Sequence, residues 1–166
     1  MNRPENNTSL AERFPGEGDI PSPFNMEPLH QRRYLKQGEL LPWNGPVADV
    51  MSPVYLRSTL ALRPRIIGSY PVFGERESME ILESAVAAYD RGHGAWPTSP
   101  PEERIRCIRE FGARMMEKRD IIAGMLMWET GKSHADSARE FDRTMTNLDT
   151  AIQSLASITN ESARTV

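Results

Sequence analysis

Apolar residues recur at helical spacing only in the second half of the chain. From residue 79 onward, four segments carry an apolar residue at about every third or fourth position, which is the pattern of a helix that buries one face. The sequence therefore predicts about four α-helices, of which the last is the longest. The four stripes are Met79, Leu82, Val86 and Tyr89; Ile105, Ile108, Gly112 and Met115; Ile122, Met125, Leu126 and Glu129; and Ala138, Phe141, Met145, Leu148, Ile152 and Leu155.

Each predicted helix has a recognisable end signal. Gly92 and Gly131 follow the first and third stripes, where glycine readily adopts the left-handed conformation that ends a helix. Ser99 precedes two prolines and Glu102, an arrangement that predicts a capped start for the second helix. Ser133 is the expected cap of the fourth helix.

The first half of the chain favours extended structure. All but three of the 13 prolines lie in the first 71 residues, and proline interrupts helices. We expect residues 34–40 and a second stretch ending near residues 50–54 to form a small antiparallel hairpin, followed by an extended connector at residues 66–72. Residues 1–32 contain few bulky aliphatic side chains, which predicts a mobile lead-in.

Such a hairpin offers too little surface for four amphipathic helices. A two-stranded hairpin is marginally stable by itself, and every apolar helix face needs a surface to pack against. The sequence therefore predicts one part of a larger protein.

Composition narrows the classes of partner and the compartment. With 39% hydrophobic residues and a net charge of -3, the chain has a globular composition without the positive field that attracts nucleic acid. It has no apolar run near 18 residues and no apolar segment behind Met1, so we expect neither membrane insertion nor a secretory signal. The single Cys107 cannot form an internal disulfide, which favours a reducing, cytoplasmic setting.

Three candidate chemistries are weak. Cys107 has arginine neighbours that favour a thiolate, but no histidine stands beside it in the sequence, so we interpret it as structural. His30, His93 and His134 are too far apart for a local metal motif, and we predict no metal. The glycine pair at residues 92–94 follows a helix rather than a strand, so it predicts a loop and not a dinucleotide site.

The polar side of the last predicted helix is more informative. Two guanidinium groups lie among small hydrogen-bonding side chains opposite the apolar stripe, and such a face can hold an anion. The alternative is an ordinary solvent-exposed helix face on which Glu140 forms an ion pair with Arg143. The residues of this face are Arg139, Arg143, Thr146, Asn147 and Thr150.

Several segments, in this order and spacing, resemble the aldehyde dehydrogenase superfamily over about residues 33–158. Within it, residues 126–129 and 136–144 are most similar to the NADP-dependent, non-phosphorylating glyceraldehyde-3-phosphate dehydrogenases. The segments that carry the wider resemblance are residues 34–39, 68–71, 85–89, 94–97, 101–104, 128–132 and 140–144.

The resemblance implies an α/β aldehyde dehydrogenase fold of which only the amino-terminal fragment is present. Residues 33–166 would form the incomplete start of the nucleotide-binding domain, with the central parallel sheet encoded beyond Val166. The family oxidises a small-molecule aldehyde, here glyceraldehyde 3-phosphate, to the carboxylate through a cysteine thioester, with NADP or NAD as cofactor. The full-length protein would be a homotetramer or homodimer, and the fragment by itself would be inactive.

The resemblance assigns a substrate-binding role to one residue and argues against a catalytic role for Cys107 and for one tripeptide. Residues 140–144 match a Glu-x-x-Arg-Thr run whose arginine contacts the substrate phosphate in the phosphate-recognising branch, which places that role on Arg143. Pro42-Trp43-Asn44 and Cys107 lie far ahead of the family's oxyanion and nucleophile positions, so neither is assigned a catalytic role. We predict no catalytic, cofactor-binding or metal-binding residue in this chain. The alternative function is a non-catalytic helical binding or assembly module.

Overall fold

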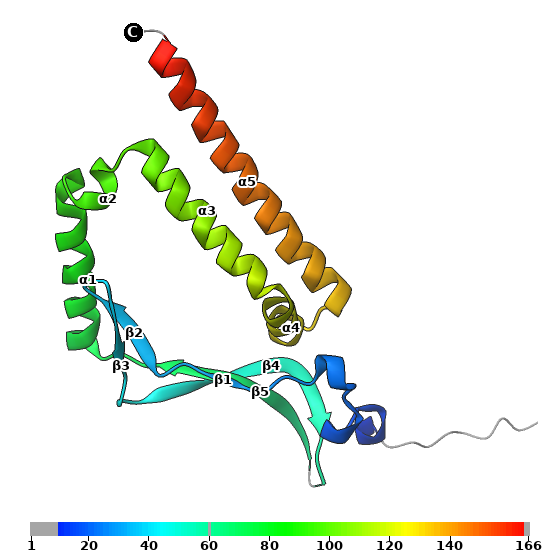
Figure 1. Cartoon of the computed structure of the whole chain (residues 1–166). Coiled ribbons are helices and arrows are strands. Elements are labelled where there is room, and N and C mark those ends of the chain that lie inside the picture. Colours follow the sequence, from blue (N-terminus) through cyan, green and yellow to red (C-terminus); the bar gives the residue numbers. More distant parts are fainter. Residues whose placement is uncertain (1–9, 60, 165–166) are drawn as a thin grey trace, which may run out of the picture.

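The computed structural model describes residues 10–59 and 61–164, in which short strands precede long helices (Figure 1). The strands are β1 (Leu29–His30), β2 (Arg33–Lys36), β3 (Glu39–Pro42), β4 (Val47–Arg57) and β5 (Leu62–Pro71). The helices are α1 (Glu75–Tyr89), α2 (Ala95–Thr98), α3 (Pro101–Glu117), α4 (Arg119–Thr130) and α5 (His134–Arg164). The described part of the chain is thus mostly helical, as the apolar stripes predict.

The strands form a small mixed sheet and a separate hairpin. β4 pairs with β5 in antiparallel register from Val47 opposite Pro71 to Arg57 opposite Leu62, and β1 adds to β5 in parallel. β2 and β3 pair only with each other among the described strands. The predicted hairpin between residues 34–40 and the stretch ending near residues 50–54 is wrong, because Gln37 and Gly38, with φ values of 53° and 80°, turn the chain so that β2 pairs with β3. The stretch ending near residues 50–54 lies in β4, which pairs instead with β5, the strand that contains most of the predicted connector at residues 66–72.

The described part of the predicted lead-in is packed against the rest of the molecule. Residues 10–32 form three short 3-10 turns before β1, and Ile20 and Met26 contact the central hydrophobic cluster. The Arg65 side chain donates hydrogen bonds to the Asn25 side chain and to the Met26 carbonyl at 2.8 and 2.6 Å. Ile20, Met26 and the two hydrogen bonds from Arg65 thus give residues 10–32 contacts that their low aliphatic content does not predict. The mobility of this segment stays a prediction.

The predicted helix ends are confirmed for α4 and α5 and differ for α1 and α3. Gly131 ends α4 at a φ of 69°, and Ser133 caps α5. At the end of α1, Asp90 is the left-handed cap, and Gly92, two residues later, also has a positive φ of 88°. Ser99 does not cap α3, because its hydroxyl donates to the Ala95 carbonyl of the preceding turn at 2.6 Å, and α3 begins at Pro101.

A compact core joins α4 to the sheet. Leu56 of β4, Ile67 of β5 and Trp128 of α4 form the buried cluster. The Trp128 indole nitrogen donates to the Phe24 carbonyl at 2.8 Å, and the buried Ser52 hydroxyl donates to the Trp128 carbonyl. The indole N–H and the carbonyl of Trp128 are therefore both satisfied where they are buried.

Helices α3 and α5 form an antiparallel pair that stands away from the sheet (Figure 1). Gly112 allows their close approach, because a Cβ atom there would lie 3.3 Å from Leu148 and 3.4 Å from Met145. Ile105 of α3 and Ile152 of α5 are buried and line one cavity between the two helices, and Phe141 of α5 is also buried. None of the described helices is both long and apolar enough to cross a membrane.

The apolar stripe of α1 is uncovered. Its members Met79, Leu82, Val86 and Tyr89 are 47%, 53%, 61% and 60% exposed. The sequence predicts such a shortage of packing surface, since the small sheet cannot cover all the helices.

Candidate anion-binding site on helix α5

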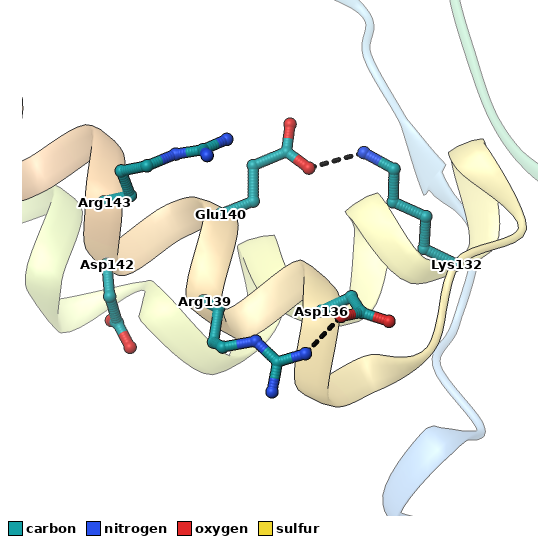
Figure 2. Close-up of a pocket in the computed structure, with 6 residues that line it drawn as sticks. All are labelled: Lys132, Asp136, Arg139, Glu140, Asp142 and Arg143. Atoms are coloured by element: carbon teal, nitrogen blue, oxygen red, sulfur yellow. Dashed lines mark hydrogen bonds and ion pairs between the residues drawn. The ribbon is translucent and has the colours of Figure 1, made fainter.

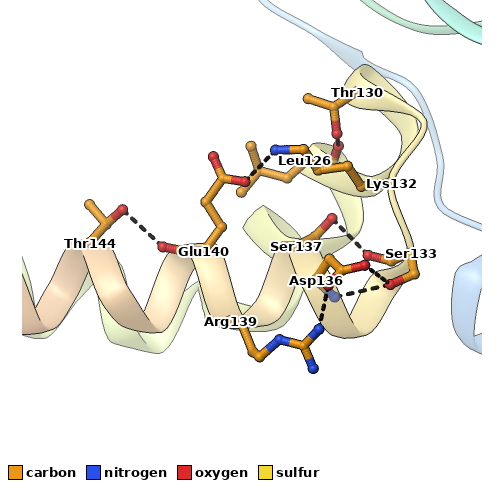
Figure 3. Close-up of polar contacts among 9 residues, drawn as sticks. All are labelled: Leu126, Thr130, Lys132, Ser133, Asp136, Ser137, Arg139, Glu140 and Thr144. Carbon is orange, nitrogen blue, oxygen red and sulfur yellow. Dashed lines mark hydrogen bonds and ion pairs between the residues drawn. The ribbon is translucent and has the colours of Figure 1, made fainter.

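The first turn of α5 is built by the loop that leaves α4. The left-handed Gly131 donates its N–H to the Met127 carbonyl at 3.0 Å and turns the chain toward Ser133. The Ser133 hydroxyl accepts the Asp136 N–H at 3.1 Å and donates to the Asp136 carboxylate at 2.6 Å (Figure 3). This reciprocal cap fixes the start of the helix and the direction of its side chains.

Three carboxylates lie on the first turns of α5, and each has a cationic partner. Asp136 pairs with Arg139 on the same helix. Glu140 accepts a hydrogen bond from the Lys132 ammonium at 2.5 Å, and Asp142 accepts two from Arg119 of α4 at 2.7 and 2.6 Å. The last pair is bidentate, the geometry in which arginine binds a carboxylate best.

These partners lower the pKa of all three carboxyl groups. The Ser133 hydroxyl, followed by Arg139, lowers the pKa of Asp136. Lys132 lowers the pKa of Glu140, and Arg119 lowers the pKa of Asp142. The three groups are therefore ionised at neutral pH and are already neutralised by neighbouring cations.

Arg143 lies beside this network, and its charge adds to that of Lys132 in lowering the pKa of Glu140. Its guanidinium makes no hydrogen bond or ion pair with any residue that the structure describes, and its side chain is exposed. A surface depression of about 690 Å³ surrounds it, and Figure 2 shows Arg143 and Glu140 on the same side of α5. The depression is lined by Lys132, Asp136, Arg139, Glu140, Asp142 and Arg143.

The rest of the predicted polar face contributes less than expected. Thr146 and Thr150 donate their hydroxyl protons to the carbonyls of Asp142 and Thr146 in the preceding turn, at 3.0 and 2.9 Å. Arg139 is occupied by Asp136. Asn147 is exposed, so the donors that an incoming anion finds available on this face are the Arg143 guanidinium and the Asn147 amide.

The ion pair of Glu140 with Arg143, predicted in the alternative interpretation of this face, does not form among the described residues, although the charge of Arg143 contributes to lowering the pKa of Glu140. Glu140 turns to Lys132 instead. The sequence does not single out Lys132 and Arg119, because Lys132 is 8 residues from Glu140 and Arg119 is 23 residues from Asp142. No helical period connects residues across two elements, so only the crossing of α4 and α5 brings them together.

The other candidates lie elsewhere. Cys107 is a partly exposed, free thiol on α3. Trp43 packs edge-on against Tyr34 and Phe73, with ring centroids 5.9 and 4.8 Å away, so Pro42-Trp43-Asn44 belongs to an aromatic cluster beside the hairpin. Over residues 10–59 and 61–164, no three His, Cys, Asp or Glu side chains come together in a way that could hold a metal ion.

The loop at residues 92–94 does not have the form of a dinucleotide fingerprint. Gly94 follows α1 and a 3-10 turn rather than a strand, and a Cβ atom there would collide with the Ala88 carbonyl oxygen. This glycine therefore serves the close packing of a loop on α1, and not the approach of a pyrophosphate.

The family assignment comes from comparison with known proteins. The aldehyde dehydrogenase family model matches residues 62–165, which include β5, all of the helices and the α5 site. The chain belongs to the aldehyde dehydrogenase family. No solved structure matches it significantly.

Three curated relatives of this aldehyde dehydrogenase family chain share about 30% identity with it. The N-succinylglutamate 5-semialdehyde dehydrogenase of Chromobacterium violaceum is 30% identical over 90 residues, 54% of this chain and 18% of that protein. The alpha-ketoglutarate semialdehyde dehydrogenase of Haloferax volcanii is 29% identical over 80 residues, 48% of this chain and 16% of that protein. The malonate-semialdehyde dehydrogenase 2 of Shouchella clausii is 31% identical over 77 residues, 46% of this chain and 15% of that protein.

The matched parts of this chain thus span less than a fifth of each relative. The relatives support the superfamily that the sequence resembles, and their names contain semialdehydes rather than glyceraldehyde 3-phosphate.

Proposed function

We propose that this chain is the amino-terminal part of an NAD(P)-dependent aldehyde dehydrogenase whose substrate carries an anionic group, and that Arg143 binds that group. The observation that carries the proposal is the Arg143 guanidinium, unpaired among the described residues, beside three carboxylates that other cations neutralise. A planar guanidinium donates two parallel hydrogen bonds to a phosphate or a carboxylate.

Two anionic aldehydes are consistent with such a donor. The Glu-x-x-Arg-Thr run at residues 140–144 favours glyceraldehyde 3-phosphate, the substrate expected from the sequence. The names of the three relatives contain semialdehydes of carboxylic acids, which favour a carboxylate in the same place. The shared chemistry is an oxyanion at the end of the molecule opposite the aldehyde.

The chemical step and the cofactor are assigned to the remainder of the protein. The family uses a cysteine nucleophile and NAD or NADP. In this chain Gly94 serves the packing of a loop on α1, and Cys107 is not assigned a catalytic role. In this proposal α5 holds and orients one end of the aldehyde, which raises the fraction of bound substrate that is correctly placed. The full-length enzyme would be a cytoplasmic homotetramer or homodimer.

The uncovered α1 stripe favours a second candidate function, a non-catalytic module that docks on a partner protein. Two experiments separate the candidates. Sequencing the gene downstream of the Val166 codon should reveal the remaining dehydrogenase motifs, whereas an authentic stop codon followed by unrelated sequence would favour the module. The 166-residue chain should produce no NADH or NADPH absorbance at 340 nm with any aldehyde, while the continued reading frame should do so.

The substrate assay uses glyceraldehyde 3-phosphate, succinate semialdehyde and unsubstituted glyceraldehyde with the complete enzyme. A preference for either anionic aldehyde over glyceraldehyde supports the proposal and decides between phosphate and carboxylate. Equal kcat/KM for all three would contradict anion recognition.

A further inference from the structure

Lys132 separates two side chains that would otherwise pair. Glu140 and Arg143 are three residues apart on one helix, a spacing at which opposite charges form ion pairs. The structure instead joins the Glu140 carboxylate to the Lys132 ammonium at 2.5 Å (Figure 2). The Arg143 guanidinium, which points toward Glu140 in this view, is left without a hydrogen bond among the described residues.

We infer that Lys132 is a positioning residue that holds Glu140 away from Arg143 and so keeps the Arg143 guanidinium available for the substrate anion. This inference rests on the proposed function. It assigns to Lys132 a contact with Glu140 only, and it assigns the contact with the anion to Arg143.

The physical basis is competition between two anions for one cation. A released Glu140 would occupy the donors of Arg143 and would also repel an approaching phosphate or carboxylate. Lys132 removes both effects, because it neutralises the carboxylate and fixes its direction. The Glu140 side chain is 37% exposed, so this competition is reduced but not abolished by solvent screening.

The backbone that carries Lys132 is firmly held. Gly131 is hydrogen-bonded to Met127, and a Cβ atom on it would lie 3.4 Å from Pro53 of β4, so the loop rests against the sheet. Lys132 also lines a cavity of about 270 Å³ together with Trp128, which gives its aliphatic stem apolar neighbours. The sheet and α4 thereby fix the backbone position from which the Lys132 side chain reaches Glu140.

The other two carboxylates on the first turns of α5 are also paired with cations other than Arg143. Asp136 is held by Arg139 and Asp142 by the bidentate Arg119. Lys132 pairs with Glu140, the carboxylate that lies on the same side of the helix as Arg143. Replacing Lys132 is therefore the substitution that tests the inference.

The test is a double-mutant cycle in the full chain, with inorganic phosphate as the probe. Backbone amide shifts of residues 132–144 in NMR spectra give the dissociation constant. Lys132→Met should weaken phosphate binding about two- to five-fold, the range expected for freeing one exposed carboxylate. Glu140→Gln should leave the affinity unchanged or slightly tighter, and the double variant should match Glu140→Gln.

Lys36→Met is the matched control, because Lys36 forms a similar ion pair with Glu80 at 2.7 Å between β2 and α1. It removes the same charge and should not change phosphate affinity. If Lys132→Met caused an equal loss in the unmodified chain and in the Glu140→Gln variant, Lys132 would contact the anion itself, and the inference would be overturned. No loss in either background would also overturn it.

The variant Arg143→Ala separates a failure of the Lys132 inference from a failure of the proposed anion binding by Arg143. Loss of the phosphate-induced shifts in Arg143→Ala supports the assignment of Arg143. Unchanged shifts in Arg143→Ala would remove Arg143 from the site and overturn the proposed anion recognition. If Arg143→Ala abolishes binding while Lys132→Met behaves like the unmodified chain, only the role of Lys132 is wrong.

Discussion

The guanidinium carbon of Arg65 lies 4.4 Å above the ring of Trp128. Arg65 belongs to β5 and Trp128 to α4, so this stacking joins the sheet to the helix. Arg65 is only 9% exposed, and its hydrogen bonds to Asn25 and Met26 tie the amino-terminal turns to the same point. One charged side chain thus holds three parts of the chain together.

Replacing Arg65 should destabilise the fold. Arg65→Met keeps an aliphatic stem over Trp128 but removes the cation and both hydrogen bonds, which should lower the free energy of unfolding by about 2 kcal/mol. Urea denaturation followed by Trp fluorescence measures the change. Arg63→Met is the control, because Arg63 is exposed on the same strand and its replacement should have little effect. Equal destabilisation by the two variants would contradict the role of Arg65.

A larger residue at position 112 should separate α3 from α5. Gly112→Val places methyl groups where Leu148 and Met145 already pack, and overpacking of this kind costs about 1–3 kcal/mol. Circular dichroism should show a lower melting temperature. Ala113→Val, which changes the exposed neighbouring position, should melt close to the unmodified chain. A stable Gly112→Val variant would show that the two helices have room to spare.

Acid should weaken the junction of α4 and α5. Hydrogen bonds from Arg119 hold the pKa of Asp142 below its ordinary value of 3.8, and Lys132 does the same for Glu140 below 4.5. A carboxyl with a lowered folded pKa stabilises fully above its unfolded pKa, and this contribution is lost as the pH falls through the folded value. The melting temperature should therefore hold above about pH 5 and decline below about pH 4.

The variant Asp142→Asn isolates this effect. It should reduce the acid-dependent part of the decline, because the bidentate pair with Arg119 is gone at every pH. Asp149→Asn on the exposed side of α5 is the comparison, and its pH profile should follow that of the unmodified chain. Identical profiles for all three proteins would place the acid sensitivity elsewhere.

Arg143→Ala in the complete enzyme should change substrate preference rather than the chemistry. Loss of a charged hydrogen-bonding group should raise KM for the anionic aldehyde about tenfold or more, with a much smaller effect on glyceraldehyde. Steady-state kinetics with both substrates measures the change in KM for each aldehyde. Arg139→Ala is the matched control, because Arg139 already pairs with Asp136 and is not assigned to the substrate. Equal changes in KM for both aldehydes in Arg143→Ala would contradict the assignment.

The sequence predicts the helices well because their evidence is local. The three-to-four spacing from Ala138 to Leu155 depends only on residues of one helix, and so does the glycine stop at Gly131. Gly38 marks a bend, but which strands pair is set by contacts between β4 and β5 that local spacing does not contain.

The candidate site is only partly predictable, because several of its contacts join residues that are far apart in the sequence. Arg143 stands out within its own helix, whereas Lys132 and Arg119 reach the site from the preceding loop and from α4. Their partners are set by how α4 crosses α5, and that crossing depends on Trp128 packing on the sheet. Local spacing contains no information about such a crossing.

Helix α4 contacts the sheet through Trp128 near one end and α5 through Arg119 at the other. The cations that neutralise Asp142 and Glu140 therefore come from outside α5, one from α4 and one from the loop that follows it. Any displacement of α4 on the strands would carry Arg119 away from Asp142, so the charge balance on the first turns of α5 depends on how α4 is seated on the sheet.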